Sequence, residues 1–553
     1  MNKPELVEVS QEQIDELLAL TKGTLPSEKY RLLEAVLGTF VYVMQALQTA
    51  KTSLKRFKRM LFGATTESKS NLLKPGSAMA QGRSPQQPPA ATAAPSDRDD
   101  AREAAALESS AAASSSRHTG HGRNGAQAYA GATVITMEHP SLKSGDRCPQ
   151  CQGGKVYTYE PRRLVRWIGQ APLAPTVYHI ERLRCRMCDS LFSAPLPAGI
   201  DERHYDESSA AMIALLKYGT GMPWYRLQGL QANLQLPLPD ATQWEIVERA
   251  AQAPRWVFEE LIRQAAQSPL LHNDDTPTKI VELMKSAKVS AQEGEPAQAR
   301  AVNTSCIVAP LDTHKVVLYF TGPKHAGENL ARVLAHRAQQ LAAPIQMCDA
   351  LSRNYPKDFA TLIANCLTHA RRNFVDVMEF FPEPCSYVIE LLAEIYRHDS
   401  YCKEHTLSPE QRLAYHQSHS GPRMEELKTW MDTQFDERLV EPNSGLGKAI
   451  KYMHKRWNKF TLFLRQAGAP LDNNLCERSL KKAILHRKGS LYYRTVRGAE
   501  VGDIYMSLIA TCEHCEVNAF EYLKALQRQA VRVREHPHLW LPWNYHEQLA
   551  DTL

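Results

Sequence analysis

Three carboxylates in separate parts of the chain have the residue types and positions that suit divalent metal ions. Asp274 follows one short apolar run, and Asp349 follows another. Glu477 lies in the first turn of an expected helix that residues 472–474 would cap. Two metal ions about 4 Å apart need several hard oxygen ligands, which two strand-end aspartates and one helix glutamate can supply. The spacing alone also fits a plain helix-cap ion pair at Glu477.

The segments around these acids predict a mixed sheet that would bring the first two together. Two β-rich runs, 302–310 and 315–321, follow Asp274, and a helix is expected at 327–341 before the strand that ends at Asp349. Strand, strand, strand, helix, strand is the order that an RNase H-like fold requires. In that fold, neighbouring central strands would present the two aspartates side by side. A long, largely helical stretch then precedes the third acid.

Positive charge follows Glu477 along its helix and beyond it, which predicts contacts with a phosphodiester backbone. Arg487 and Lys488 are the candidates for steadying the scissile phosphate, with non-specific backbone contact as the equal alternative. His369 and Arg372, one helical turn apart, are expected either to line the site or to have a structural role. The predicted DNA-binding residues are Arg478, Lys481, Lys482, Arg487, Lys488, His369 and Arg372.

Four cysteines form two CxxC pairs that predict a structural zinc site. The pairs are Cys148 with Cys151 and Cys185 with Cys188. Tetrahedral zinc takes four thiolates, and each CxxC turn supplies two of them. Short strands expected between the pairs give a zinc-ribbon-like module. The CxxC pair at 512–515 has no second pair in sequence and is interpreted as helix-end cysteines.

A small helical module is expected between the zinc module and the first acid. Its three helices are predicted at 208–218, 224–233 and 242–251. Three short helices with a tight turn before the last resemble a helix-turn-helix, whose last helix can enter the major groove. Gln243, Glu245 and Glu248 would then face DNA, but two acids weaken base reading, and a plain packing role is the alternative.

The first part of the chain predicts a long helix followed by a linker. From Leu33 to Leu61, apolar residues alternate in steps of three and four, which suits a coiled coil or a helix packed on its own domain. The end of this stripe is basic. Residues 64–130 are rich in Ala, Ser, Pro, Gln and Gly, so they bury little apolar surface and predict a mostly disordered linker.

Composition excludes some classes of protein. The chain has 553 residues, 43% of them hydrophobic and 23% charged, with a net charge of +6. Its longest apolar stretch is too short to cross a bilayer, and its first residues lack a signal-peptide core. Twelve cysteines in so long a chain are too few for a disulfide scaffold and favour metal binding in a reducing compartment.

Several motifs resemble those of the insertion-sequence-66 family of bacterial DDE transposases. They are His272–Pro277, Cys348-Asp349, Cys366–Arg372 and Asp472–Arg478, with further matches upstream at 60–63, 120–125, 168–172, 182–185 and 217–219. The resemblance implies a catalytic triad of Asp274, Asp349 and Glu477, a zinc-finger domain at the four cysteines, Mg²⁺ or Mn²⁺ as cofactor, and DNA transposition. Asn273 and Asp275 depart from the family, whose members usually carry Ala and Glu there.

The expected fold class is multidomain α+β. The predicted parts are a coiled-coil and basic helical segment (1–63), a low-complexity linker (64–130), a zinc-finger domain (131–200), a helix-turn-helix-like module (201–268), an RNase H-like DDE catalytic domain (269–525) with a helical insertion at about 373–465, and a C-terminal tail (526–553).

The predicted function is that of an insertion-element transposase, which binds terminal inverted repeats and catalyses metal-dependent phosphodiester hydrolysis and strand transfer. Two alternatives are a non-catalytic, zinc-dependent DNA-binding regulator derived from a transposase, and an RNase H-like nuclease. The expected partners are double-stranded DNA, at element ends and target, and further copies of the chain in a homodimer or higher oligomer. Small accessory proteins of the same element are implied too, no membrane is expected, and the expected location is the cytoplasm, at the bacterial nucleoid.

Overall fold

The computed structural model describes residues 18–22, 26–37, 136, 139–158, 169–184, 191–292 and 302–550. The chain divides into two compact units, one formed by residues 66–170 and the other by residues 1–65 with 171–553. Residues 27–37 are helical, but most of the apolar stripe from Leu33 to Leu61 and the whole of the predicted linker at 64–130 lie outside the described residues.

A five-stranded mixed sheet lies at the centre of the larger unit. Its strands are β3 (Leu270–Pro277), β4 (Asn303–Pro310), β5 (Lys315–Gly322), β6 (Ile345–Cys348) and β7 (Leu362–Asn365). Their order is β5-β4-β3-β6-β7; β3, β4 and β5 are antiparallel neighbours, while β6 and β7 continue the sheet parallel to β3. The strands expected at 302–310 and 315–321 are therefore confirmed. The structure adds β7 and the helix α8 (Val281–Gln292), and α9 (Ala326–Leu334) is shorter than expected.

The free edge of the sheet at β5 is covered by side chains of the helix α16 (Val496–His514). Backbone amides at alternate positions of β5 donate hydrogen bonds to α16 residues spaced four apart. The pairs are Val317 to Thr511 (3.1 Å), Tyr319 to Ser507 (2.9 Å) and Thr321 to Asp503 (2.6 Å). An uncovered edge would offer these amides to another chain, so α16 closes the sheet on this side.

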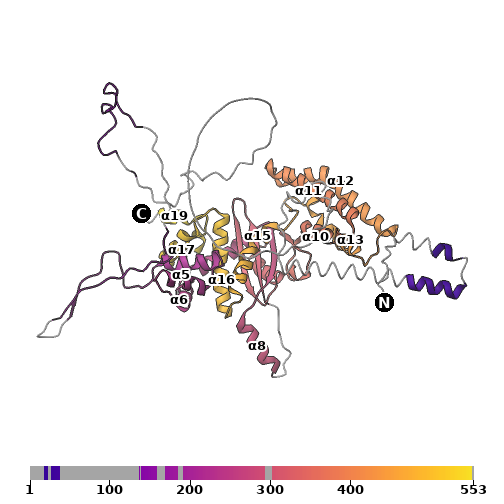
Figure 1. The fold of residues 1–553 in the computed structure, drawn as a ribbon, viewed down its shortest axis with the longest axis horizontal. Helices are drawn as coiled ribbons and strands as arrows, with labels where there is room; N and C mark the ends of the chain where they lie inside the picture. The colour runs from indigo at the N-terminus through magenta and orange to yellow at the C-terminus, as the bar shows by residue number, and fades with distance from the viewer. Residues whose placement is uncertain are drawn as a thin grey trace, which may run out of the picture. The chain divides into compact units, whose positions relative to one another are not determined.

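Two hydrophobic cores flank the central strands. One core contains side chains of β4 and β5, of helices that precede them in the chain and of helices that follow them. The preceding helices are α4 (Glu207–Ala214), α5 (Trp224–Asn233), α6 (Asp240–Ala250) and α7 (Gln252–Ala266), and the following ones are α16 and α17 (Ala519–Arg528). The other joins β6 and β7 to α10 (Leu367–Val377), α11 (Pro382–Glu404), α12 (Pro409–Asp436) and α13 (Gly445–His454). Figure 1 shows these groups at opposite ends, with α15 (Asn474–Ser490) between them. The predicted insertion at about 373–465 is therefore helical.

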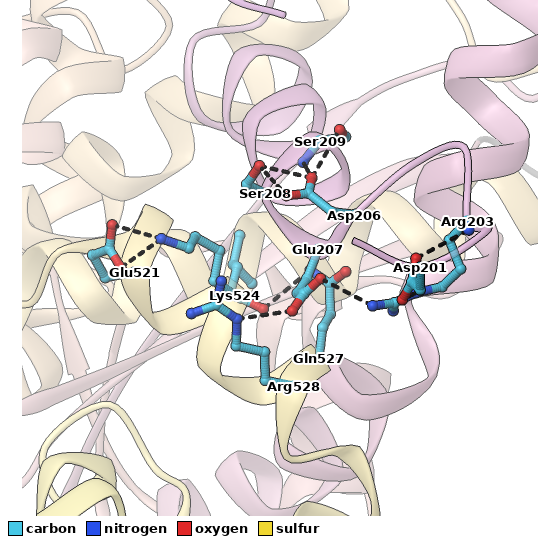
Figure 2. A network of polar contacts seen from close by, with 11 residues as sticks. Asp201, Arg203, Asp206, Glu207, Ser208, Ser209, Glu521, Lys524, Gln527 and Arg528 are labelled. Carbon is cyan, nitrogen blue, oxygen red and sulfur yellow. Dashed lines mark hydrogen bonds and ion pairs between the residues drawn. The ribbon is translucent and has the colours of Figure 1, made fainter. Parts of the chain in front are cut away.

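Polar contacts tie the first helix of the small helical module to the C-terminal part of the chain (Figure 2). Asp206 caps α4 by accepting a hydrogen bond from the amide of Ser209 at 3.0 Å. Glu207, in the first turn, accepts a hydrogen bond from Arg528 Nε of α17 at 2.8 Å. Because α4 and α17 also share the same apolar core, the module packs against segments about 300 residues later. Among the described helices, none is long and apolar enough to cross a membrane.

Acidification is expected to destabilise the protein through His486. Its ring lies buried in α15 between Tyr218 and Tyr493, at centroid distances of 5.8 and 4.9 Å. Burial, and then the charge of Lys217, lower the pKa of His486 to about 3. The unfolded histidine titrates near 6.5, so the unfolded state takes up the proton first as the pH falls from 6.5 toward 3, and folding stability is lost over that range.

His486→Phe keeps an aromatic ring between the two tyrosines and removes the titrating imidazole. Between pH 6.5 and 5, we expect the variant to lose about 2 kcal/mol less unfolding free energy than the wild type. Urea unfolding at both pH values measures this difference. An equal loss in both proteins would mean that His486 is not responsible.

Candidate active site

The sheet register brings the two predicted aspartates together. On neighbouring parallel strands, His272 of β3 lies opposite Met347 of β6. Two residues further along, Asp274 of β3 comes beside Asp349, the first residue after β6, and the alternation of side chains puts both on the same face. The convergence that the sequence predicted for these two acids therefore follows from the observed pairing.

Burial is the largest influence on the pKa values of the two aspartates at this edge of the sheet. Burial raises the pKa of Asp274 to about 7, with repulsion from Asp349 as the next largest cause and with smaller effects of the same sign from Asp275 and Glu477. Burial likewise raises the pKa of Asp349. A buried carboxylate that lies beside another acid is stabilised in its ionised form by a cation placed between them.

Glu477 is held near this pair because Asn473, four residues earlier, is fastened to β3. The Asn473 side chain is fully buried. Its Nδ2 donates to the carbonyl of Asn273 at 3.2 Å, and its Oδ1 lies 3.0 Å from Nδ1 of His272. Burial lowers the pKa of His272 to about 4, so the ring is neutral near pH 7 and donates its Nδ1 proton to the amide oxygen. Through these hydrogen bonds, Asn473 connects the helix that carries Glu477 to the strand that carries Asp274.

Asp349 is oriented by a buried amide network. Asn354 Nδ2 donates to Asp349 Oδ1, and the amide of Leu351 donates to the same oxygen at 3.2 Å. The Asn354 carbonyl in turn accepts from Gln346 Nε2 at 2.7 Å and from Asn273 Nδ2 at 2.8 Å. Asn273, one of the two departures from the family motif, therefore helps to position the loop that carries Asp349.

Asp275, the other departure, points away from the acidic pair. Its side chain is fully buried, with Oδ2 3.0 Å from Nδ1 of His325 and Oδ1 3.1 Å from Nη2 of Arg353. These contacts fasten the short 3₁₀ helix Ser352–Asn354 against the start of α9. Its partners give Asp275 a structural role beside the site.

Gly327 is the position where a small substitution is expected to disturb this loop. A Cβ there would lie 2.7 Å from the carbonyl oxygen of Arg353, and the carbonyl oxygen of Tyr355 would be closer still. We expect Gly327→Ala to lower the unfolding free energy by about 3 kcal/mol, because backbone must move to make room. The control is Gly229→Ala in α5, where the added Cβ meets nothing within 4 Å and a gain of about 0.5–1 kcal/mol is expected. Urea unfolding measures both variants, and a neutral Gly327→Ala would contradict the packing described.

His369 and Cys366 complete the surroundings of Glu477. The Nδ1 of His369, in the first turn of α10, lies 3.7 Å from Oε1 of Glu477. One ligand atom from each of Cys366, His369 and Glu477 lies within 4.8 Å of the others, as in a metal-binding group. The buried sulfur of Cys366 also accepts a hydrogen bond from the amide of Asn473 at 3.2 Å, and burial raises the pKa of this thiol to about 12.

Two of the predicted DNA-binding cations are engaged within the protein. Arg487 Nη1 donates to the hydroxyl of Thr276, at 3.0 Å, and to the carbonyl of Pro277 at the end of β3. Lys482 pairs with Glu513 at 2.7 Å. Arg372 is half-buried on α10, whereas Arg478, Lys481 and Lys488 are exposed on α15 and form no ion pair with any residue that the structure describes.

Sequence reasoning missed three cations on the Asp349 side. Arg353 follows Asp349 closely, and its charge lowers the pKa of that carboxyl against the effect of burial. From the helical insertion, Lys459 lies 4.4 Å from the ring centroid of Tyr355, and Arg456 lies 4.6 Å from that of Tyr452. The run Arg456-Trp-Asn-Lys459, which mixes cations with an aromatic residue, was the available signal in the sequence.

The predicted base-reading face of the helical module is only partly accessible. Gln243 is fully buried, and its Nε2 donates to the carbonyls of Trp224 and Leu238 at 3.3 and 3.0 Å. For this residue the packing alternative is correct and base reading is wrong. Glu245 is exposed, and Glu248 accepts a hydrogen bond from Arg497 at 3.3 Å.

The described half of the cysteine quartet forms a tight turn. In the unit 66–170, the amide of Cys148 donates to the carbonyl of Gly154 at 2.8 Å, and that of Gln152 donates to the carbonyl of Cys148 at 2.9 Å. Hydrogen bonds from the backbone of Cys151, and then of Gln150, lower the pKa of the Cys148 thiol, which suits a metal-binding thiolate. Cys185 and Cys188 lie outside the described residues, so the zinc site stays a prediction.

Comparison with known proteins agrees with the motif resemblance. The model of the family described as "Transposase IS66 family" matches residues 203–501, more than half of the chain. Two uncharacterized proteins of Sinorhizobium fredii (strain NBRC 101917 / NGR234) are similar. The chain is 25% identical to y4jD, over 68% of this chain and 74% of the relative, and 24% identical to y4hP, over 68% of each. The chain therefore belongs to the IS66 family of transposases.

Proposed function

We propose that the protein is the DDE transposase of an insertion element, with Asp274, Asp349 and Glu477 as its catalytic carboxylates. The observation that carries the proposal is the placement of two strand-end aspartates side by side, with a helix glutamate fastened to the same strand through Asn473. The strand order, three antiparallel strands followed by two parallel ones, supports an RNase H-like catalytic domain.

The donor set fits divalent metal ions. Two neighbouring carboxylates have raised pKa values, and Glu477 Oε1 is buried without a hydrogen-bond partner among the described residues. Bound Mg²⁺ or Mn²⁺ would supply a Lewis acid and a hydroxide-like nucleophile for an in-line attack on phosphorus. The chain itself orients Asp349 through the side-chain amide of Asn354. Exposed Arg478, Lys481 and Lys488 are proposed to contact the DNA backbone.

The remaining parts of the chain are proposed to recognise and pair the element ends. The cysteine quartet would hold a structural zinc ion, and this domain and the helical module would bind the terminal repeats. The apolar N-terminal helix would pair two copies of the chain. Accessory proteins of the same element, and action at the nucleoid in the cytoplasm, belong to the same proposal.

Strand transfer tests this function directly. The full-length protein is incubated with DNA carrying both element ends and with a supercoiled target plasmid, with Mg²⁺ or Mn²⁺ or with a chelator. We expect metal-dependent cuts that leave 3′-hydroxyls, followed by joined products. Cuts without joining would indicate a nuclease instead, and binding without cuts would indicate a regulator.

A further inference from the structure

Two buried polar atoms at the edge of the acidic site face each other without a hydrogen-bond partner in the described part of the chain. They are Nδ1 of His369 and Oε1 of Glu477. Leaving a buried polar atom unpaired is unfavourable, so native structures seldom keep two of them together without a reason. Their proximity indicates that a third group belongs between them.

The separation of these atoms fits a shared cation. At 3.7 Å, they are too far apart for a hydrogen bond, which needs about 2.7–3.2 Å. Ligand distances of about 2.1 Å around one ion place two neighbouring donor atoms roughly 3.0–3.6 Å apart. The observed gap therefore closes around an ion with only a small movement. Cys366 lies near as well, but its sulfur is already occupied by the Asn473 amide.

His369 belongs to the first turn of α10, and the backbone at the start of this helix is hydrogen-bonded to two other segments. The amide of Cys366, which precedes α10, donates to the carbonyl of Cys348 at the end of β6 at 3.1 Å. The next amide, that of Leu367, donates to the carbonyl of Leu471 just before α15 at 3.0 Å. The first turn of α10 therefore moves with the two elements that carry Asp349 and Glu477, as a metal ligand must.

We propose that His369 is a direct ligand, through Nδ1, of the ion that Glu477 holds, and that this position therefore takes Mn²⁺ in preference to Mg²⁺. Mg²⁺ is bound almost entirely by oxygen, whereas Mn²⁺ also prefers oxygen ligands but, as a transition-metal ion, accepts an imidazole nitrogen beside them more readily than Mg²⁺ does. The inference rests on the proposed function, because Glu477 must be a metal ligand. It replaces DNA contact as the role expected for His369.

Electron paramagnetic resonance of the full-length protein tests the inference without a catalytic assay. During a titration with Mn²⁺, the spectrum measures the concentration of free ion and so gives the affinity of the protein for Mn²⁺. Pulsed spectra of the bound ion detect a directly coordinated nitrogen. The variants are His369→Asn and Glu477→Gln. The control is His454→Asn, which removes an exposed histidine whose Nε2 lies 2.8 Å from Oδ1 of Asp432. Competition with Mg²⁺ gives the affinity for that ion.

We expect nitrogen modulation in the wild type and in His454→Asn, and its loss in His369→Asn. His369→Asn is expected to weaken Mn²⁺ binding at least tenfold while changing Mg²⁺ affinity by less than about twofold. If the wild type binds Mn²⁺ but shows no nitrogen modulation, the inference is wrong, and this result does not depend on whether a variant folds. The inference is also wrong if His369→Asn loses affinity for Mn²⁺ and for Mg²⁺ to the same extent. If Glu477→Gln leaves Mn²⁺ binding unchanged, the Asp-Asp-Glu site itself fails, which is a separate result.

Discussion

Asp274→Asn and Asp349→Asn are each expected to lower cleavage of element ends by about 10³-fold or more while leaving end binding within about twofold. Each change removes one anionic oxygen from the crowded pair, and with it most of the attraction for two divalent ions. A 10³-fold loss corresponds to about 4 kcal/mol of transition-state stabilisation. Cleavage of end-labelled DNA and a gel-shift assay on the same preparations measure the two quantities.

The matched control is Asp358→Asn, which makes the same chemical change at an exposed residue of the loop between Asn354 and β7. This variant is expected to cut at the wild-type rate. Wild-type cleavage by either Asp274→Asn or Asp349→Asn would reject the catalytic assignment. A parallel loss of end binding would instead assign the aspartate to DNA recognition or folding.

Asn473→Ala is expected to have the next largest effect, on both stability and rate. The change leaves a buried histidine nitrogen and a buried carbonyl, those of His272 and Asn273, without their partner. Two unpaired buried groups cost about 2–4 kcal/mol of unfolding free energy. The first turn of α15 is then no longer fastened to β3, and a displacement of about 1 Å at Glu477 would lower the cleavage rate about 10²-fold.

Urea unfolding and cleavage well below the melting temperature separate these two effects. Asn443→Ala, at an exposed asparagine before α13, is the control and is expected to change neither quantity. If Asn473 positions Glu477, the Asn473→Ala variant must cleave more slowly than the wild type at saturating DNA and bind DNA with the same affinity. If the rate fell only in proportion to the unfolded fraction, Asn473 would be a stability residue with no part in placing Glu477.

Elements with strong local patterns could be predicted from the sequence. β4 and β5 are long apolar runs separated by a polar turn at 311–314, and both formed as expected. The four-residue strand β7 has no such pattern, since Leu362 is exposed, and it becomes a strand by pairing with β6. α9 ends at Leu334, and Arg337, expected to be helical, lies beyond it and donates to the carbonyls of Ala266 and Ser268 at 2.6 and 2.8 Å.

In the candidate site, too, some residues could be predicted from the sequence and others could not. Acids at the ends of apolar runs are visible in the sequence, which is why the pairing of Asp274 with Asp349 could be predicted from it. The groups that hold these acids could not be found in that way. Asn473 contacts a strand 200 residues earlier, and the role of Asn354 depends on a loop that only tertiary packing orders. The buried position of Gln243 could not be predicted either, because the amphipathic pattern of α6 does not reveal which face packs on α5.

Metal positions in a crystal of the full-length protein with Mn²⁺ test the central claim most directly, through the anomalous scattering of manganese. We expect manganese to be bound by Asp274, Asp349 and Glu477. Manganese bound elsewhere, or Glu477 remote from the bound manganese in every assembled form, would contradict this claim.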